Sequence, residues 1–109
     1  MVALRRGDFV WVDFDPQAEH EQTKRRPALV LSPDEYNKRS NLILVLPITS
    51  KRKNYPFEVV LPDNLAVSGS ILTDQIKNID PIARKCAYCG HIPNDILAEV
   101  LAKVHVLTT

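Results

Sequence analysis

A hydrophobic run between two aspartates near the start of the chain predicts a first strand. Within residues 8–14, DFVWVDF, every second residue falls on the same side, as in a strand whose side chains point alternately to its two faces. A polar loop follows Pro16, and the short β-prone run ALVL, residues 28–31, comes after Pro27. Because proline is confined to the ends and edges of strands, we expect the second strand to begin after Pro27.

Three later stretches also predict strands. Residues 42–48, LILVLPI, form an apolar run too short for a typical helix, which predicts a strand buried on both faces and ended by Pro47. Residues 55–61, YPFEVVL, alternate with the period of a strand. Residues 70–79, SILTDQIKNI, fit one bent strand or two short strands that meet near Asp74 and Gln75. Between the second and third strands, PDEYNKRS predicts a turn or a single helical turn.

The period changes near the C-terminus, where the sequence predicts a helix. Apolar residues there recur with the spacing of one helix face at Ile96, Leu97, Val100, Leu101 and Val104. We expect Asn94 or Asp95 to cap the start of this helix. Five or six short strands followed by one helix, without βαβ alternation, predict a mainly β fold with a C-terminal α-helix, a small antiparallel barrel or curled sheet.

Composition and charge narrow the class of protein. The chain has 109 residues, 45% of them hydrophobic and 25% charged, which is typical of one globular domain covering residues 1–109. No segment approaches the ~20 apolar residues of a membrane helix or has the pattern of a signal peptide, so we expect a cytoplasmic protein with no membrane contact. The net charge is only +1, but cations cluster beside the predicted strands, and several such loops on one face would suit a polyanion.

Two cysteines and a histidine occur in the run CAYCGH, residues 86–91. A C-x-x-C pair is half of a zinc site, but a closed site needs four ligands and the chain has no second pair. A redox pair would be expected near a βαβ unit, which the sequence lacks. We therefore interpret Cys86 and Cys89 as free thiols in a turn, with metal binding as the alternative.

The stretch EHEQTKRRP, residues 19–27, carries the residue types that phosphodiester chemistry needs. It offers cations for a developing phosphoryl charge and a carboxylate or imidazole for proton transfer, whereas the chain has no Gly-rich phosphate loop and no EF-hand pattern. RNA is the natural substrate for such a set because its own 2′-OH can attack the adjacent phosphate. Neither a metal-activated water nor a protein nucleophile is then required.

Several short motifs together resemble a known family. RGDFVWVDFDP, HEQ, RPALVLS, LPITS, YPFEVVL and TDQIKNID follow one another from about Arg6 to the C-terminal helix. In this order and spacing they resemble the MazF/PemK family of toxin-antitoxin ribonucleases, the mRNA interferases. The resemblance implies an SH3-like β-barrel and a homodimer that cuts single-stranded RNA at short sequences. It implies no metal or other cofactor, products with 2′,3′-cyclic phosphate and 5′-OH ends, and neutralisation by an acidic cognate antitoxin.

The resemblance also implies which residues carry the chemistry. It places Arg26 and Thr49 at the family's catalytic pair and Glu21 and His20 on the active loop. Arginine keeps its charge at all ordinary pH values, so Arg26 suits a phosphate clamp, while Thr49 can donate a hydrogen bond to a nonbridging oxygen. Glu21 is our candidate base, and His20 could act as base or acid. Alternatively, Glu21 only pairs with an arginine of its own loop, and Thr49 only begins a turn.

Further residues are expected to bind RNA. Those placed to meet the RNA backbone or to belong to the family's loop and DQ motif are Gln22, Lys24, Arg25, Lys51, Arg52, Lys53, Asp74 and Gln75. Tyr55 could stack on a base, and so could Phe57 unless it is part of the core. Some relatives have an arginine two residues before the aspartate, where this chain has Leu72, which favours a mechanism centred on Arg26 over one centred on Asp74. Asp74 alternatively only caps a bend.

Two other functions fit the same fold. One is a non-enzymatic toxin that inhibits a protein target such as DNA gyrase, and the other is a plain SH3-like peptide-binding module. We favour the ribonuclease because neither alternative needs an acid, an imidazole and an arginine grouped before the second strand.

Overall fold

The computed structural model describes residues 3–14 and 25–109, and in these residues it contains seven strands and two helices. The elements are β1 (Asp8–Asp13), β2 (Arg25–Val30), α1 (Asp34–Ser40), β3 (Ile43–Thr49), β4 (Glu58–Val60), β5 (Ser70–Leu72), β6 (Lys77–Ile79), β7 (Ala87–His91) and α2 (Asn94–Thr108). All strand pairs are antiparallel, in the order β4-β5-β3-β2-β1-β7, and β6 also pairs with β3.

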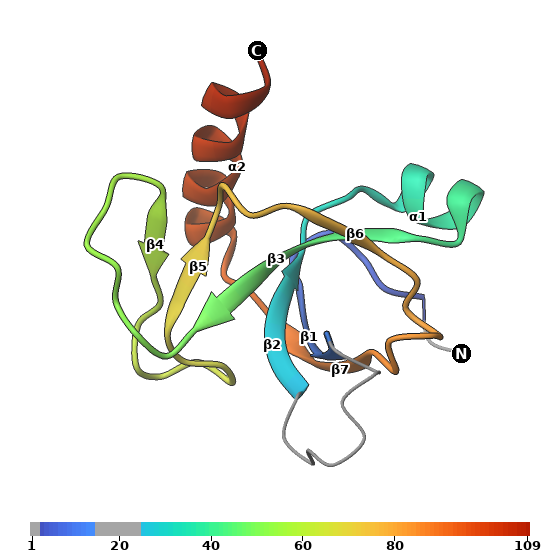
Figure 1. The fold of residues 1–109 in the computed structure, drawn as a ribbon. Helices are drawn as coiled ribbons and strands as arrows, with labels where there is room; N and C mark the ends of the chain where they lie inside the picture. Colours follow the sequence, from blue (N-terminus) through green and yellow to red (C-terminus); the bar gives the residue numbers. More distant parts are fainter. Residues whose placement is uncertain (1–2, 15–24) are drawn as a thin grey trace.

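Figure 1 shows the sheet curling, with α2 along one side and α1 on the other. Its end strands, β4 and β7, do not pair with each other within the described residues, so the sheet is curled like an SH3 barrel without closing. The predicted fold class is confirmed.

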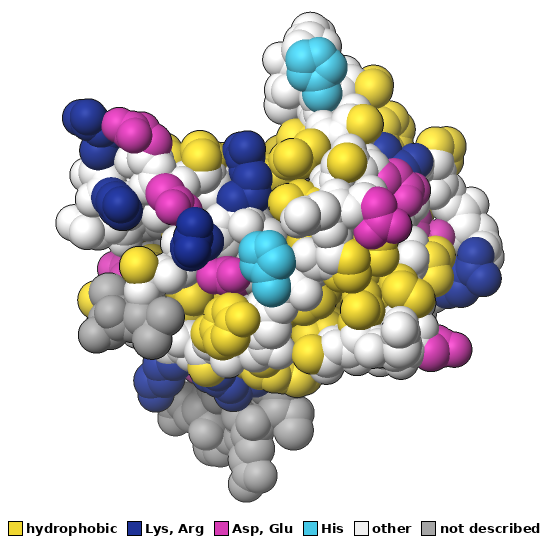
Figure 2. All heavy atoms as spheres, turned by 180° about the vertical axis from the view of Figure 1, so that it is seen from behind, with side chains coloured by type: hydrophobic (Ala, Val, Ile, Leu, Met, Phe, Trp, Pro, Cys, Tyr) yellow, Lys and Arg dark blue, Asp and Glu magenta, His cyan; other side chains and the backbone are white. Residues whose placement is uncertain are grey.

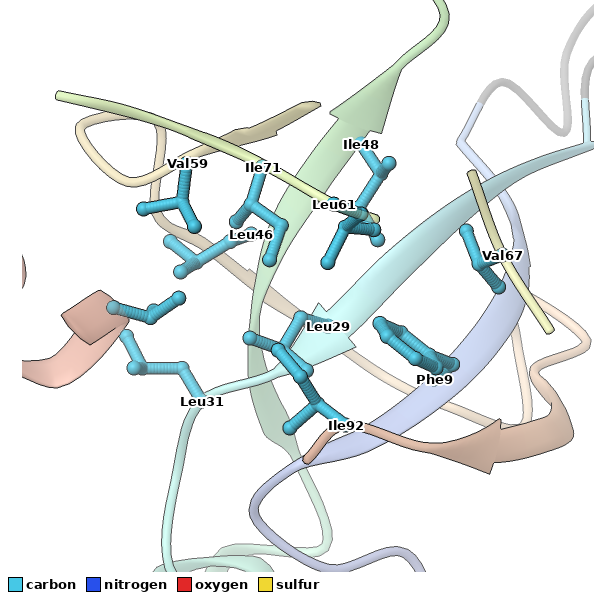
Figure 3. Packing of buried hydrophobic residues seen from close by; sticks show 11 residues of the cluster. Phe9, Leu29, Leu31, Leu46, Ile48, Val59, Leu61, Val67, Ile71 and Ile92 are labelled. Carbon is cyan, nitrogen blue, oxygen red and sulfur yellow. The ribbon is translucent and has the colours of Figure 1, made fainter. Parts of the chain in front are cut away.

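The alternation seen in the sequence buries both faces of the sheet. One face contributes Phe9, Leu29, Leu46 and Ile48 to a larger apolar cluster, drawn in Figure 3, which Ile96, Leu97, Leu101 and Val104 of α2 cover. The other face contributes Val10, Val12, Ala28, Val30 and Val45 to a smaller cluster, which Leu4, Phe14 and Cys86 pack against. Neighbouring residues of one strand therefore belong to different clusters, so a register slip of one residue would exchange them and is strongly disfavoured.

Two prolines lie inside strands, contrary to the sequence-based boundaries. β2 begins at Arg25, before Pro27, and β3 continues past Pro47 to Thr49. Residues 43–45 of β3 pair with β6, and residues 48–49 pair with β5. Pro47 falls in the gap between these two partners, so its missing N–H interrupts neither pairing. These extensions carry both strands out to the residues of the candidate site.

Other boundaries also differ from the predictions. Residues 87–91 of the run CAYCGH form strand β7 and not a turn, because β1 offers them an antiparallel partner. β4 covers only Glu58–Val60 of the predicted stretch. After Pro33, where we expected a turn or a single helical turn, the chain forms the seven-residue helix α1. The stretch 70–79 forms two short strands, as one of the two alternatives proposed. The N-cap of α2 is Pro93, without a side-chain cap, so neither Asn94 nor Asp95 occupies that position.

The searched part of the chain, residues 3–14 and 25–109, has no helix with the length and hydrophobicity needed to span a membrane.

Candidate active site

Strands β2 and β3 bring Arg26 and Thr49 to the same end of the sheet. The register pairs Ala28 with Pro47 and Leu29 with Leu46, and the same register continued by two residues sets Arg26 opposite Thr49. Both residues line each of two neighbouring clefts. The structure therefore places side by side the two residues that the sequence assigned to one catalytic pair.

The two clefts differ in what surrounds this pair. The first has a volume of about 390 Å³, and its wall is completed by Trp11, Pro27, Ile48, Ser50, Ala66, Val67 and Ser68. The second has a volume of about 310 Å³, and its wall is completed by Phe14, Pro47, Ile48, Lys53, Leu72, Gln75 and Lys77. The first offers a large apolar surface at Trp11, whose side chain is 40% exposed. The second adds two lysines to the charge of Arg26, which suits a polyanion.

The position of Thr49 is fixed by close packing and by a hydrogen bond. A Cβ on Gly69 would lie 2.3 Å from the Thr49 carbonyl oxygen, and Gly69 has a φ of +120°, so only glycine fits there. The Thr49 Oγ1 accepts the backbone N–H of Lys51 at 3.2 Å, the bond of a serine/threonine turn. Because Oγ1 is the acceptor in this bond, its own hydrogen is available for an acceptor in the cleft.

The basic loop, residues 51–53, leaves β3 next to Thr49 and is held by an acid from β4. The carboxylate of Glu58 accepts the backbone N–H of Lys53 at 2.6 Å and that of Asn54 at 3.0 Å. The Lys53 N–H above all lowers the pKa of Glu58, and the Asn54 N–H and the charge of Arg52 act in the same direction. Glu58 thus remains ionised and fixes the loop that presents three cations beside the clefts.

Tyr55 and Asp74 are joined by a hydrogen bond. The phenol of Tyr55 donates to Oδ1 of Asp74 at 2.5 Å. Partial burial raises the pKa of Tyr55 to about 12, and the bond to Asp74 and the negative charges of Asp74 and Glu58 contribute to the same shift. The pair ties the segment before β4 to the turn after β5, so Asp74 does more than cap a bend.

The remaining predicted site residues fall into two groups. Arg25 is exposed, yet its guanidinium donates to the carbonyl oxygens of Lys85 at 3.0 Å and Trp11 at 3.5 Å, so part of its hydrogen-bonding capacity is already used. His20, Glu21, Gln22 and Lys24 lie outside the described residues.

Three residues near the pair were not predicted from the sequence: Trp11, Glu58 and Lys77. Trp11 lies on the same side of the first strand as the buried Phe9, so the alternation of the strand gave no signal that Trp11 is exposed. Lys77 follows the DQ motif by two residues, so the period of a strand could have indicated it. Nothing in the local sequence indicates that Glu58 reaches back to residues 53 and 54.

The cysteines and His91 do not share a site. Cys86 packs against the smaller apolar cluster and Cys89 against the larger one, so the two thiols lie on opposite faces of β7, and both are free. His91 hydrogen-bonds Asp8 instead. Within residues 3–14 and 25–109, no group of three or more His, Cys, Asp and Glu side chains is placed to hold a metal ion.

Comparison with known proteins identifies the family of this chain. The sequence profile described as "PemK-like, MazF-like toxin of type II toxin-antitoxin system" matches residues 5–108. The "Endoribonuclease toxin MazF" of Escherichia coli K12 is 44% identical over 101 residues, 93% of this chain and 90% of the relative. The crystal structure of MazF from Deinococcus radiodurans superposes with a TM-score of 0.86 at 45% identity, covering 99% of this chain and 98% of that one. A MazE-MazF structure from the same organism gives a TM-score of 0.86 at 40% identity, covering 99% and 97%. The chain belongs to the PemK-like, MazF-like family of type II toxin-antitoxin toxins.

Proposed function

We propose that this toxin cleaves single-stranded RNA at short sequences, without a metal ion, through attack of the RNA's own 2′-OH. The chain is an endoribonuclease, as are its curated relatives over most of its length. The finer proposal is supported by one observation above all: Arg26 and Thr49 line the same two clefts, one of which also carries Lys53 and Lys77.

The reaction needs three groups, and we assign them as follows. The 2′ oxygen attacks the adjacent phosphorus, the bond from phosphorus to the 5′ oxygen breaks, and the products carry a 2′,3′-cyclic phosphate and a 5′-OH. Arg26 meets the negative charge on the five-coordinate phosphate, and Thr49 donates its hydroxyl hydrogen to a nonbridging oxygen. Glu21 takes the 2′ proton, and His20 gives a proton to the 5′ oxygen as that oxygen leaves; in the alternative assignment His20 is the base and Glu21, in its protonated form, is the acid.

No metal ion is required by this chemistry. A metal ion commonly serves to make a nucleophile from water at neutral pH, whereas here the nucleophile belongs to the substrate. The fixed charge of Arg26 replaces the cation that would otherwise meet the phosphoryl oxygens.

RNA binding is assigned to the surroundings of the pair. Lys51, Arg52 and Lys53, with Lys24 and Arg25, meet backbone phosphates. Tyr55, and also Trp11 at the wall of the first cleft, offer aromatic faces to unstacked bases. Asp74 and Gln75 complete the RNA-binding set, with Asp74 acting through Tyr55 and with Gln75 and Gln22 offering amides to base edges.

Partners are assigned by family and by analogy. A relative forms a MazE-MazF complex, and we propose that this chain likewise has a cognate antitoxin, whose acidic segment competes with RNA for the basic surface. We further propose that the chain works as a homodimer in the cytoplasm.

The proposal is tested by incubating the purified, antitoxin-free protein with a defined single-stranded RNA in EDTA and mapping the product ends. We expect cleavage at a short recurring sequence, with 5′-OH ends and cyclic phosphates at the other ends. Ends with a 5′-phosphate would overturn the 2′-OH mechanism. No cleavage at all would favour a non-enzymatic toxin that inhibits a protein such as DNA gyrase.

A further inference from the structure

A third cleft lies away from the Arg26–Thr49 pair, between the N-terminal segment, the end of β7 and the first turn of α2. Its volume is about 610 Å³, and the polar residues that line it are Arg5, Arg6, Asp8, Tyr88, His91 and Asn94. None of its described lining residues belongs to the two clefts of the active site. The back of the molecule in Figure 2 shows a histidine beside an acidic side chain, with basic side chains gathered close by.

A buried carboxylate orients the histidine of this cleft. Nδ1 of His91 lies 2.9 Å from Oδ1 of Asp8, whose other oxygen accepts the backbone N–H of Arg5 at 2.8 Å. Asp8 is only 5% exposed, and both of its oxygens are engaged. Because the carboxylate accepts from Nδ1, the ring keeps its hydrogen on Nδ1, and Nε2 is the atom left for a ligand.

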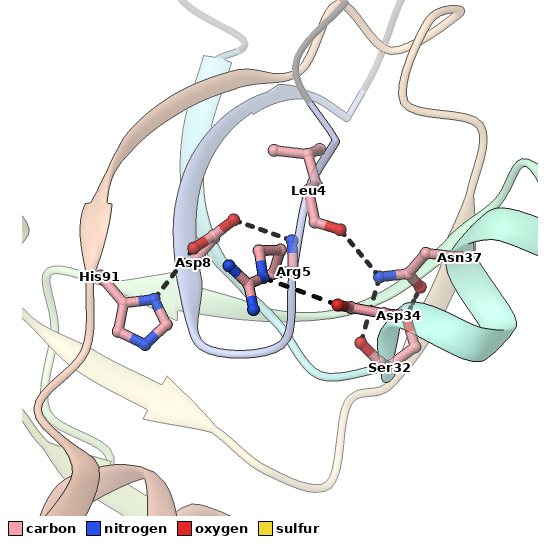
Figure 4. Close-up of polar contacts among 7 residues, drawn as sticks. All are labelled: Leu4, Arg5, Asp8, Ser32, Asp34, Asn37 and His91. Atoms are coloured by element: carbon pink, nitrogen blue, oxygen red, sulfur yellow. Dashed lines mark hydrogen bonds and ion pairs between the residues drawn. The ribbon is translucent and has the colours of Figure 1, made fainter.

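Gly7 fixes the ring from the other side. A Cβ at this residue would come within 2.7 Å of Cε1 of His91 and 3.0 Å of Nε2, so the imidazole packs directly on the backbone of the turn before β1. Figure 4 shows Nδ1 pointing to Asp8 and the second ring nitrogen pointing away from it. The side chain of His91 is 46% exposed, which leaves that nitrogen open to the cleft.

Positive charge and hydrogen-bond donors dominate the walls. Nε of Arg6 donates to the carbonyl oxygen of Leu31 at 2.7 Å. This hydrogen bond anchors the guanidinium and leaves its two terminal amino groups as donors for a ligand. Arg5 is exposed, and its Nε lies 3.6 Å from Asp34, a distance that neutralises its charge only in part. Among the described lining residues Asp8 alone is acidic, and its oxygens are already engaged.

We propose that this cleft binds a phosphate group, held by the guanidinium groups of Arg5 and Arg6 and by Nε2–H of a protonated His91 supported by Asp8. Guanidinium groups and a charged imidazole are the donors that phosphate oxygens prefer, and Tyr88 and Asn94 add neutral donors at the rim. The phosphate belongs either to the backbone of a nucleic acid strand or to a free phosphate or phosphomonoester. The site is separate from the one that carries the proposed cleavage.

Histidine NMR tests the site, with His105 as an internal control. His105 lies in the last turn of α2, outside the cleft. Inorganic phosphate is titrated at about pH 6 against chloride of equal ionic strength, and the ring resonances are followed. We expect a saturable shift of the His91 resonances that the His105 resonances do not share. Equal shifts of both rings, or no shift of His91, would overturn the proposal.

Two arginine variants test the contribution of the guanidinium groups. Arg5→Gln should weaken phosphate binding several-fold, whereas Arg39→Gln, which removes the same charge from a residue paired with Glu35 on α1, should not. Equal affinities of the two variants for phosphate would contradict the proposed site. Circular dichroism and the melting temperature establish that both variants are folded.

A single-stranded oligodeoxynucleotide, which lacks the 2′-OH and cannot be cut by the proposed reaction, distinguishes the two sources of phosphate. If the site serves a nucleic acid strand, the oligonucleotide shifts His91 and inorganic phosphate reverses the shift. If the site serves a free phosphate or a phosphomonoester, only the small anions shift His91.

Discussion

Glu58 accepts the backbone N–H of Lys53 at 2.6 Å, so an acid holds in place the loop that presents three cations beside the candidate active site. Glu58 has two opposite effects on RNA binding, one through its charge and one through its hydrogen bonds. A carboxylate near bound RNA repels the phosphates, whereas its hydrogen bonds hold the backbone of Lys53 and Asn54 at the end of the basic loop. Whether a variant without the Glu58 carboxylate binds RNA more weakly or more tightly shows which of the two effects is larger.

We predict that Glu58→Gln weakens RNA binding although it removes a negative charge. The amide offers one oxygen in place of two and turns an N–H donor toward the backbone N–H groups of Lys53 and Asn54, so the loop loses its fixed conformation. The expected loss is roughly three- to tenfold in affinity. It is measured with a single-stranded RNA analogue that cannot be cleaved.

Glu35→Gln is the matched control for this prediction. Glu35 pairs with Arg39 on the surface of α1, and its replacement removes the same charge far from the basic loop. The control should bind RNA as the wild type does. Tighter binding by Glu58→Gln than by the control would show that repulsion outweighs positioning.

Gly69→Ala should disturb the active site through Thr49. The added Cβ would lie 2.3 Å from the Thr49 carbonyl oxygen at a φ of +120°, so the backbone of Thr49 must move. We expect a loss of stability of at least about 1–3 kcal/mol and a fall in RNA cleavage per folded molecule. Gly7→Ala is the control, because Gly7 also has a positive φ but its added Cβ would meet His91, which lines neither cleft beside Thr49. Equal cleavage per folded molecule by the two variants would contradict the coupling to Thr49.

Tyr55 should make stability depend on pH in the alkaline range. Its pKa is about 12 in the folded chain, against 10 for an ordinary tyrosine, so the folded state holds the proton more tightly than the unfolded state. The resulting stabilisation is fully present below pH 10 and is lost as the pH rises through 12. Absorbance titration of tyrosinate should show one late-titrating residue, and Tyr55→Phe should remove it. A late phase that persists in Tyr55→Phe would assign the shift to another tyrosine.

The two cysteines should neither form a disulfide nor bind zinc. They face opposite sides of β7, and burial is the main cause that raises the pKa of Cys86 to about 11. Because the thiolate is the reactive form, alkylation at about pH 8 should be much slower than for the unfolded chain. Zinc should leave the melting temperature unchanged. A zinc-induced rise that disappears in Cys86→Ser would contradict this interpretation.

Most strands could be predicted from the sequence because their side chains alternate between two buried faces. The prediction was wrong at Pro27 and Pro47, since each proline was treated as an end of its strand. Whether a missing N–H matters depends on the neighbouring strand, and at Pro47 that neighbour changes from β6 to β5. The strand β7 was missed because its partner, β1, is distant in the sequence.

The residues of the candidate site stay a prediction, and the sequence indicated only some of those that the structure brings together. The resemblance to a family indicated Arg26 and Thr49, which the strand register then brings together. Glu58 could not be found because its role depends on hydrogen bonds to backbone groups, which no residue type signals. His91 was grouped with the cysteines by spacing alone, whereas the pairing of β7 with β1 brings it to Asp8.

The measurement that tests the central claim most directly uses an RNA with one altered sugar. The ribose on the 5′ side of the scissile phosphate is replaced by 2′-deoxyribose in an RNA that the toxin cuts at one position, and cleavage is followed in EDTA. The account predicts no cleavage of the deoxy substrate, cutting of the unmodified RNA, and a loss of at least about a hundredfold for Arg26→Ala on the unmodified RNA. Cleavage of the deoxy substrate, or full activity of a folded Arg26→Ala variant, would contradict it.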